Sequence, residues 1–484
     1  MSPALAIGII AAYFLALIII SFLTGKDDSN AAFFVGKKES PWYVVAFGMI
    51  GASLSGVTFI SVPGWVATSQ FSYMQMVLGY LAGYAVVATV LLPLYYRLNL
   101  TSIYGYLEQR FGFWSYKTGA FYFLLSRVIG ASFRLYLVAI ALHIAVFEPL
   151  DLPFWAAVLV AVLLIWVYTF RSGIKTIIWT DTLQTASMLL AVIVTIFVIK
   201  DAMGWGMVEM VSAIGDSGYS RWFFFDDVND NKFFFKQFLA GMFITISMTG
   251  LDQDMMQKNL SCKSLKDAQK NMLWFSVVLV GANVLFLSLG ALLYLKAGEI
   301  GFDPAVGGDQ LYPALALSGE LGATAGILFI IGLVAAAYSS ADSALTALTT
   351  SFCVDFLGME SKPRDTDKRT RKVVHIGFTM VLFIVIIVFE SMNDDSVIAE
   401  LFKVAGFTYG PLLGLYGFGL FTKRRVLDRA VPFIAIAAPI VCYFIQRFSE
   451  AWFDGYKIGF ELLLINGALT AFGLWAFSSR NNAP

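Results

Sequence analysis

Long apolar stretches separated by short polar segments cover most of the 484-residue sequence. A helix needs about 20 mainly apolar residues to cross the hydrocarbon core of a membrane. Stretches of about this length recur along the chain at 4–24, 43–67, 72–96, 118–147, 154–170, 177–201, 235–253, 272–296, 322–354, 373–391, 398–421, 429–447 and 458–478. Because these runs are continuous and do not alternate with polar residues, they predict thirteen membrane-spanning helices and exclude a β-barrel.

The positions of Lys and Arg orient these helices. With the N-terminus outside, 23 of the 33 basic residues fall in inside segments and seven in outside segments, while Arg127, Arg134 and Lys403 lie within spans. Basic loops stay on the cytoplasmic side. The first span has no basic region before it and no small-residue cleavage site after it, so we expect a retained helix. We therefore predict one multi-pass domain over residues 1–484 in the cell membrane, surrounded by lipid.

Composition agrees with this class of protein. Hydrophobic residues make up 58% of the chain and charged residues 14%, the mean hydropathy is +0.75, and the net charge is zero. Soluble proteins carry about 25% charged residues, so the sequence excludes a soluble globular protein, a nucleic-acid binder and a disordered chain. Two histidines and three widely spaced cysteines argue against a histidine-rich metal enzyme and a disulfide framework. We expect no enzymatic activity.

The second span contains an unusual cluster of small residues, Gly48-Met49-Ile50-Gly51-Ala52-Ser53-Leu54-Ser55-Gly56. Glycine weakens a helix, and serine side chains compete for backbone partners. One interpretation is close helix packing through small residues. The other is a discontinuous helix whose freed carbonyl groups face a cation near the middle of the membrane.

The ninth span carries Ser339, Asp342, Ser343 and Thr346 at positions i, i+3, i+4 and i+7, which places them on one face of a helix. A carboxylate within a membrane is costly and indicates a functional site by default. Hydroxyl, carbonyl and carboxylate oxygens suit a small hard cation. The alternative, in which the serines only bond back to carbonyls one turn earlier, leaves Asp342 unexplained. The stripe therefore favours a cation site.

Other charges within or beside the spans allow more than one interpretation. Asp181, near the start of the sixth span, is either a helix cap or part of a site. Arg127 and Arg134 are seven residues apart and share a face of the fourth span. They are expected to pair with Asp342 or Asp181, or to bind an anionic solute.

Four segments together resemble the sodium/solute symporter family, whose members carry galactose, proline, sialic acid or monocarboxylates. They are Phe34-Val35-Gly36-Lys37-Lys38, the run from Gly250-Leu251-Asp252-Gln253-Asp254 to Gln257-Lys258-Asn259-Leu260, Tyr338-Ser339-Ser340-Ala341-Asp342-Ser343, and Gly410-Pro411-Leu412-Leu413-Gly414 with Thr422-Lys423-Arg424. The resemblance implies an all-helical, leucine-transporter-like fold. Its core would contain two inverted repeats of five helices, spans 2–6 and 7–11, at approximately 43–201 and 235–421.

The same resemblance implies a sodium site between the second and ninth spans. Its ligands would be the carbonyl oxygens of Gly51, Leu54 and Ala336 and the hydroxyl groups of Ser339 and Ser340. This set agrees with the oxygen ligands that the residue pattern favours.

Some family members hold a second sodium ion with the aspartate at the start of span 6 and three hydroxyls of span 9. In this chain the aspartate is Asp181, and Asp342 and Ser343 stand at two of the hydroxyl positions beside Ser339. Three alternatives are open for the extra carboxylate of Asp342: it holds a second cation, it takes up a proton, or it pairs with an arginine.

The resemblance places the solute near the break in span 2, beside Ser55 and Thr58, with Tyr73 or Gln75 of span 3 close to it. In the sialic acid branch an arginine of span 4 binds the substrate carboxylate, and alignment without gaps places Gly130 at that position. The expected function is sodium-coupled symport of a small polar organic solute, which could be a sugar, a sugar acid, an amino acid or a carboxylate. Proton coupling through Asp342 or Asp181 and a membrane sensor derived from a transporter are the alternatives.

Overall fold

The computed structural model describes residues 3–24, 33–34, 36–169, 173–302, 308–359, 366–391 and 397–479. This part is helical throughout, apart from connecting loops and the two-residue strands β1 (Arg425–Val426) and β2 (Ser478–Ser479), which pair antiparallel. The long helices are α1 (Pro3–Thr24), α3 (Trp42–Ser69), α4 (Tyr73–Val86), α7 (Phe113–Leu142), α8 (Phe154–Thr169), α9 (Gly173–Ala202), α11 (Phe234–Thr245), α13 (Leu265–Glu299), α15 (Gly322–Ser351), α16 (Thr366–Glu390), α17 (Val397–Phe421), α18 (Val431–Trp452) and α19 (Leu462–Ala476). Shorter helices are α5 (Leu92–Arg97), α6 (Gly105–Arg110), α10 (Met207–Asp216), α12 (Gln253–Leu260) and α14 (Leu311–Ser318).

Each predicted span overlaps one of the long helices, although not all of these helices are long enough to count as spans on their own. Among the described residues, ten helices are long and apolar enough to cross a membrane. The segment Phe234–Gly250 joins α12 at a bend of 64° and qualifies only together with it, while α8 and α19 are shorter apolar helices. The described structure therefore gives a multi-pass helical bundle with ten clear spans.

Some helices begin before the apolar stretch that predicts them. The eighth predicted span begins at residue 272, but α13 begins at Leu265, where the Ser264 side chain accepts a hydrogen bond from the Asp267 amide (3.2 Å). Similarly, the sixth span was expected from residue 177, but α9 begins at Gly173. Apolar content marks the part of a helix that suits hydrocarbon, whereas caps mark its end.

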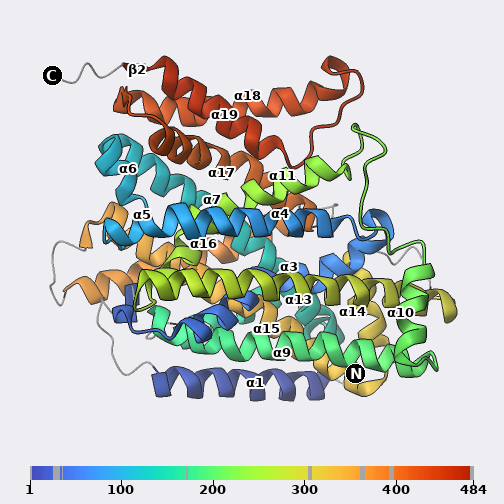
Figure 1. Cartoon of the computed structure of the whole chain (residues 1–484). Coiled ribbons are helices and arrows are strands. Elements are labelled where there is room, and N and C mark those ends of the chain that lie inside the picture. The colour runs from blue at the N-terminus through green and yellow to red at the C-terminus, as the bar shows by residue number, and fades with distance from the viewer. Residues whose placement is uncertain are drawn as a thin grey trace.

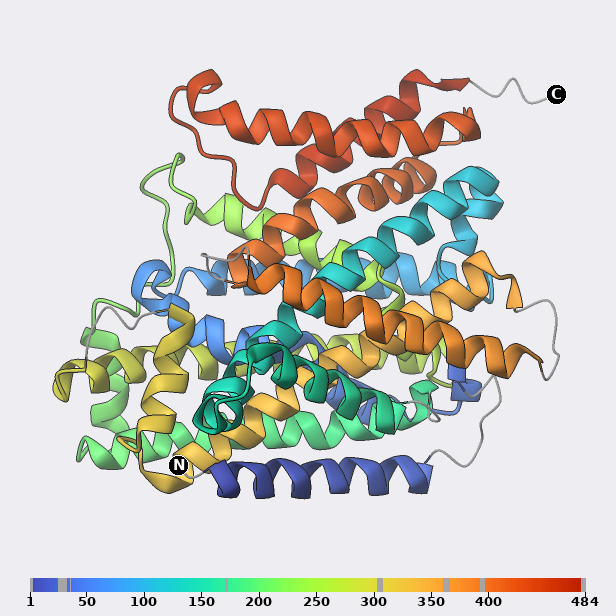
Figure 2. The ribbon, with the colours of Figure 1, turned by 180° about the vertical axis from the view of Figure 1, so that it is seen from behind.

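The helices are arranged in layers, with the first and last helices on opposite flanks. Figures 1 and 2 show α1 on one flank and α18 and α19 on the other. Between them, α3 packs against α9, α13 and α15. In α3, 89% of the most apolar 18-residue stretch is buried, compared with 17% in α1. An apolar helix that is mostly exposed suits contact with lipid, whereas α3 belongs to the protein interior.

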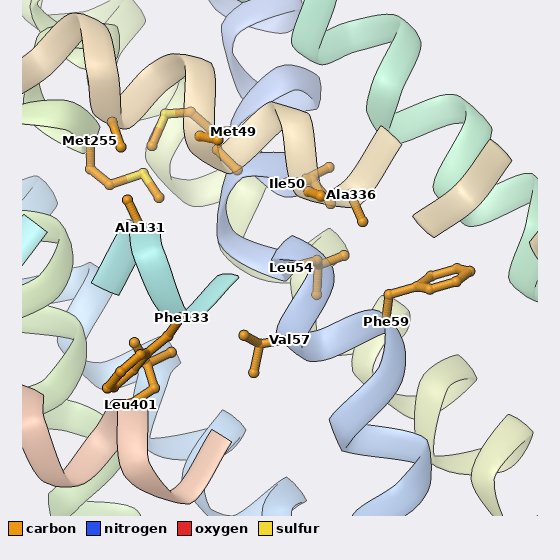
Figure 3. Packing of buried hydrophobic residues seen from close by; sticks show 14 of the residues in the cluster. Met49, Ile50, Leu54, Val57, Phe59, Ala131, Phe133, Met255, Ala336 and Leu401 are labelled. Atoms are coloured by element: carbon orange, nitrogen blue, oxygen red, sulfur yellow. The ribbon is translucent and has the colours of Figure 1, made fainter. Parts of the chain in front are cut away.

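The α3 helix is interrupted at Ser55, where φ is 33° and ψ is 172°. This break agrees with a discontinuous second span, one of the two interpretations of the small-residue cluster. Figure 3 shows Val57, after the break, pointing toward Phe133 and Leu401. On the other side, the Phe59 ring lies 5.3 Å from that of Tyr312, in an interior aromatic cluster. The half of α3 after the break is thus fixed by packing on two sides.

Candidate functional site

The break in α3 exposes backbone carbonyl groups to α15. The last four carbonyls of a helical segment have no amide partner within that segment, and here they belong to the turn that precedes Ser55. One of them, Ala52 O, accepts a hydrogen bond from Ser340 Oγ (3.4 Å). The hydroxyl-bearing face of α15 therefore meets the break.

Close packing at Gly51 brings a third helix to the same place. The Gly51 amide donates to Thr185 Oγ1 of α9 (3.0 Å). A Cβ atom at Gly51 would lie 2.2 Å from this oxygen and 3.4 Å from Ser339 Oγ. Because real Cβ atoms do not come this close to an oxygen, glycine allows α3, α9 and α15 to meet.

The residues predicted to hold sodium lie around this meeting point. Ser339 and Ser340 are fully buried, and Leu54 and Ala336 are almost fully buried. Figure 3 shows Ala336 of α15 beside Ile50 and Leu54 of α3. The structure thus brings together hydroxyl groups of one helix and the interrupted turn of another.

Asp181 lies two turns inside α9 and does not cap it. Because α9 begins at Gly173, the interpretation of Asp181 as a helix cap is wrong. Its carboxylate joins two neighbouring helices: Oδ1 accepts a hydrogen bond from Ser339 Oγ (2.7 Å), and Oδ2 accepts one from Lys258 Nζ (2.7 Å). Asp181 therefore has a buried lysine as its ion-pair partner.

Sequence reasoning missed the role of Lys258, which it counted among the basic residues of an inside loop. The residue belongs to α12, and its side chain is 1% exposed. The segment did carry a signal, because Gly250 and Asp252 interrupt an apolar span shortly before a lysine. Which acid the lysine would meet could not be read from that signal.

The polar stripe of α15 is buried along its whole length, as the pattern predicts. Asp342 and Thr346 are fully buried, and Ser343 is 1% exposed. The Asp342 Oδ1 atom accepts a hydrogen bond from the Ser343 amide (2.5 Å). The stripe therefore faces neighbouring helices and not lipid.

A second polar region is a cavity that is partly lined by residues of the break in α3. Its lining residues are Ser53, Leu54, Ser55, Val57, Thr58, Tyr73, Tyr80, Tyr84, Arg127, Arg134, Ile244, Thr245, Met248, Thr249, Met255, Leu279, Asn283, Leu401 and Phe402. The mixture of aromatic rings, hydroxyl groups and two guanidinium groups suits a small polar solute.

Three of the four residues predicted beside the solute, Ser55, Thr58 and Tyr73, line this cavity. Gln75 is not among its lining residues. Its amide instead donates to Lys232 O (2.8 Å) and accepts from the Phe224 amide (3.0 Å). Gln75 therefore holds the loop before α11 against α4.

The two buried arginines of α7 have different surroundings. Arg127 forms an ion pair with Asp254 and lies 3.8 Å from Asp252 Oδ2, so its predicted pairing with Asp181 or Asp342 is wrong. Arg134 is 6% exposed, and its Nε and Nη1 atoms have no hydrogen-bond partner within the described residues. The positive charge that the cavity offers to a solute is therefore mainly that of Arg134.

Comparison with known proteins places this architecture. The chain matches the sodium:solute symporter family over residues 33–429. The sodium/sialic acid symporter NanT of Aliivibrio fischeri is 25% identical over 476 residues, which cover 93% of this chain and 89% of that protein. Human sodium-coupled monocarboxylate transporter 1 is 24% identical over 412 residues, covering 83% of this chain and 66% of that protein.

Solved structures agree on the fold. A sodium-coupled sialic acid symporter, solved in its substrate-bound outward-open state, superposes with a TM-score of 0.81 at 19% identity and covers 98% of this chain and 99% of that one. The nucleobase-cation-symport-1 family transporter Mhp1, in a closed conformation, gives a TM-score of 0.59 at 14% identity, with 94% of this chain and 95% of that one covered.

The fold has an interrupted helix beside a buried polar stripe, and the family match identifies the chain as a secondary transporter of the membrane. This chain belongs to the sodium:solute symporter family. It is a multi-pass protein of the cell membrane that couples sodium to solute transport by alternating access, and it is not an enzyme. Sodium is the coupling ion, so the prediction of the transport class and of its ion is confirmed.

Proposed function

We propose that the chain imports a small organic solute that carries a carboxylate, together with sodium, through a single domain over residues 1–484. It crosses the membrane thirteen times with its N-terminus outside, and its core repeats cover approximately 43–201 and 235–421. The inward bias of the basic residues supports this orientation. In both views α1 begins at the end of the bundle that holds α10, and α19 ends at the opposite end (Figures 1 and 2). A chain that crosses the membrane an odd number of times has its two ends on opposite sides, so this arrangement supports thirteen crossings.

Sodium binds between the two halves of the interrupted α3 helix and α15. Its ligands are the carbonyl oxygens of Gly51, Leu54 and Ala336 and the hydroxyl groups of Ser339 and Ser340. The observation that carries this assignment is the approach of Ser340 Oγ to Ala52 O at the break. Oxygen ligands without sulfur or imidazole suit a hard monovalent cation.

The solute occupies the cavity beside Ser55, Thr58 and Tyr73, and its carboxylate meets Arg134. An arginine side chain offers a planar pair of donors that matches a carboxylate. Leaving two buried guanidinium nitrogens without hydrogen-bond partners is costly, and an anionic solute removes that cost. The related sialic acid and monocarboxylate transporters carry solutes of this charge by name.

Coupling follows from the position of the sodium site. A cation bound to both α3 and α15 stabilises the conformation in which its ligands from the two helices lie close together. The break in α3 also forms one wall of the solute cavity. A ligand shifts a conformational equilibrium only by its difference in affinity for the two states. The membrane potential then contributes about 2.3 kcal/mol per positive charge for each 100 mV.

Uptake by proteoliposomes tests this function. Purified protein should accumulate radiolabelled sialic acid or a short monocarboxylate under an inward sodium gradient, and an equal potassium gradient or a pH gradient without sodium should give no accumulation. Competition by neutral sugars of similar size serves as the matched control and should be weak. Uptake that is indifferent to sodium, or stronger competition by neutral sugars than by carboxylates, would contradict the proposal.

A further inference from the structure

Lys258 places a fixed positive charge at the buried carboxylate of Asp181. The Nζ atom lies 2.7 Å from Oδ2, and the two side chains are 1% and 0% exposed. No site in the proposed transport cycle uses this lysine. A buried pair of this kind is costly to desolvate and contributes little net stability, so its presence calls for another explanation.

The local frame holds the ammonium group in place. The α12 helix begins at the 64° bend after Gly250 and is capped by Asp252, whose side chain accepts from the Asp254 amide (2.9 Å). One residue beyond the lysine, the Asn259 side chain accepts a hydrogen bond from Asn271 of α13 (2.8 Å). The lysine therefore projects from a short helix that is fixed at both ends.

The ammonium group meets the same carboxylate that contacts the proposed sodium site. Asp181 Oδ1 accepts a hydrogen bond from Ser339 Oγ (2.7 Å), and Ser339 is one of the proposed sodium ligands. Asp342 and Ser343 follow one turn later on the same buried face of α15. The side-chain oxygens of these four residues, Asp181, Ser339, Asp342 and Ser343, would make a second cation site. The Lys258 ammonium group, however, already lies at hydrogen-bond distance from the Asp181 carboxylate.

The charges of the ion pair agree with this. The Asp181 carboxylate contributes one negative charge and the Lys258 ammonium group one positive charge, so the pair is neutral without any bound ion. A sodium ion added to this pair would create a net positive charge in a buried region of low dielectric constant, where repulsion between like charges is strong.

We propose that the Lys258 ammonium group takes the place of a second sodium ion at Asp181, so that one sodium ion accompanies each solute. This inference rests on the sodium coupling of the proposed function and concerns the number of ions. Lys258 acts as an internal cation that moves with the protein and is not transported.

Sodium binding to the purified protein and the sodium dependence of uptake test this role. Wild-type protein should bind about one sodium ion with a Hill coefficient of about one. Lys258→Gln should bind about two, with a Hill coefficient that rises toward two, because Asp181 is then free to hold a cation. Lys258→Arg, the matched control, keeps the positive charge and should still bind about one.

A second pair of variants decides the question if Lys258→Gln does not fold. Asp181→Asn leaves the ammonium group unpaired beside Ser339, and should raise the sodium concentration for half-maximal uptake about tenfold. Asp181→Asn combined with Lys258→Gln makes a neutral pair of similar size, and should restore this concentration to within about threefold of wild type.

Two sodium ions bound by wild type, a single ion bound by folded Lys258→Gln, or a double variant no better than Asp181→Asn would each overturn the inference. In the first of these cases the proposed sodium symport would stand. Solute uptake by wild type without sodium would instead refute the proposed function, and the inference with it.

Discussion

Within the described residues, a break interrupts α3 and a bend separates α11 from α12, and the two interruptions differ in how their backbone groups are satisfied. In α3 the chain changes direction at Ser55, and the described side-chain contact to the preceding carbonyls is the long bond from Ser340 to Ala52 O. Between α11 and α12, Gly250 O accepts a hydrogen bond from Tyr95 (2.7 Å), and Leu251 O accepts one from Tyr104 (3.0 Å).

The second interruption also carries its own cap. Asp252 accepts hydrogen bonds from the amides of α12 and from the Tyr409 hydroxyl (2.5 Å), and it lies beside Arg127. Its polar groups are thus satisfied by side chains, which fixes the bend as part of the scaffold. Backbone groups within a membrane need partners inside the protein or a cavity. At the break in α3 the described side-chain contact reaches Ala52 O, and we expect the other carbonyls of that turn to bind a ligand. In this molecule we therefore assign a structural role to the bend before α12 and a binding role to the break in α3.

The largest effect is expected at the structural bend. Asp252→Ala removes the cap of α12 and a partner of both Arg127 and Tyr409, so we expect a loss of about 3–5 kcal/mol in the free energy of unfolding. Thermal unfolding in detergent measures it, and Asp252→Asn, which keeps one acceptor oxygen, should lose less. Unchanged stability of Asp252→Ala would remove the distinction between the two interruptions.

The next largest effect is expected in the cavity beside α3. Arg134→Gln should raise the solute concentration for half-maximal uptake about 30-fold, which corresponds to about 2 kcal/mol, because the carboxylate loses its charged partner. Arg134→Lys should show an intermediate effect, since it keeps the charge but loses the paired donors. Sodium binding without solute should change little in either variant. Equal losses of solute and sodium binding would indicate general damage to the fold.

A smaller effect is expected at the sodium site. Ser339→Ala combined with Ser340→Ala should raise the sodium concentration for half-maximal uptake about tenfold, or about 1.4 kcal/mol, because two hydroxyl ligands are lost. Ser276→Ala is a suitable control, since this buried hydroxyl bonds back to Leu273 O in α13. A sodium dependence that is the same in the double variant and the control would rule out these ligands.

The smallest effect is expected at the break itself. Glycine adopts a positive φ angle easily, so Ser55→Gly should change the free energy of unfolding by less than about 1 kcal/mol and leave sodium dependence intact. Ser53→Gly lies in the helical part before the break and should destabilise by about 1 kcal/mol. Comparison of their unfolding temperatures checks this order. If Ser55→Gly were more destabilising than Ser53→Gly, the positive φ angle at Ser55 would not explain why α3 is interrupted there.

Much of this molecule follows from its sequence. Apolar runs located the helices because a membrane requires about 20 such residues for each crossing. The small residues around Ser55 and the stripe that begins at Ser339 identified the interrupted helix and the buried face of α15. These features are local, since they depend on the composition or periodicity of one segment.

Only the tertiary structure decided which charged groups meet. Asp181 pairs with Lys258, 77 residues away, and Arg127 pairs with Asp254, while Arg134 faces the cavity. Gln75 holds a loop instead of lining the cavity with its neighbour Tyr73. A sequence shows that buried charges need partners, but the choice among several acids and bases depends on the distances and directions that helix packing creates.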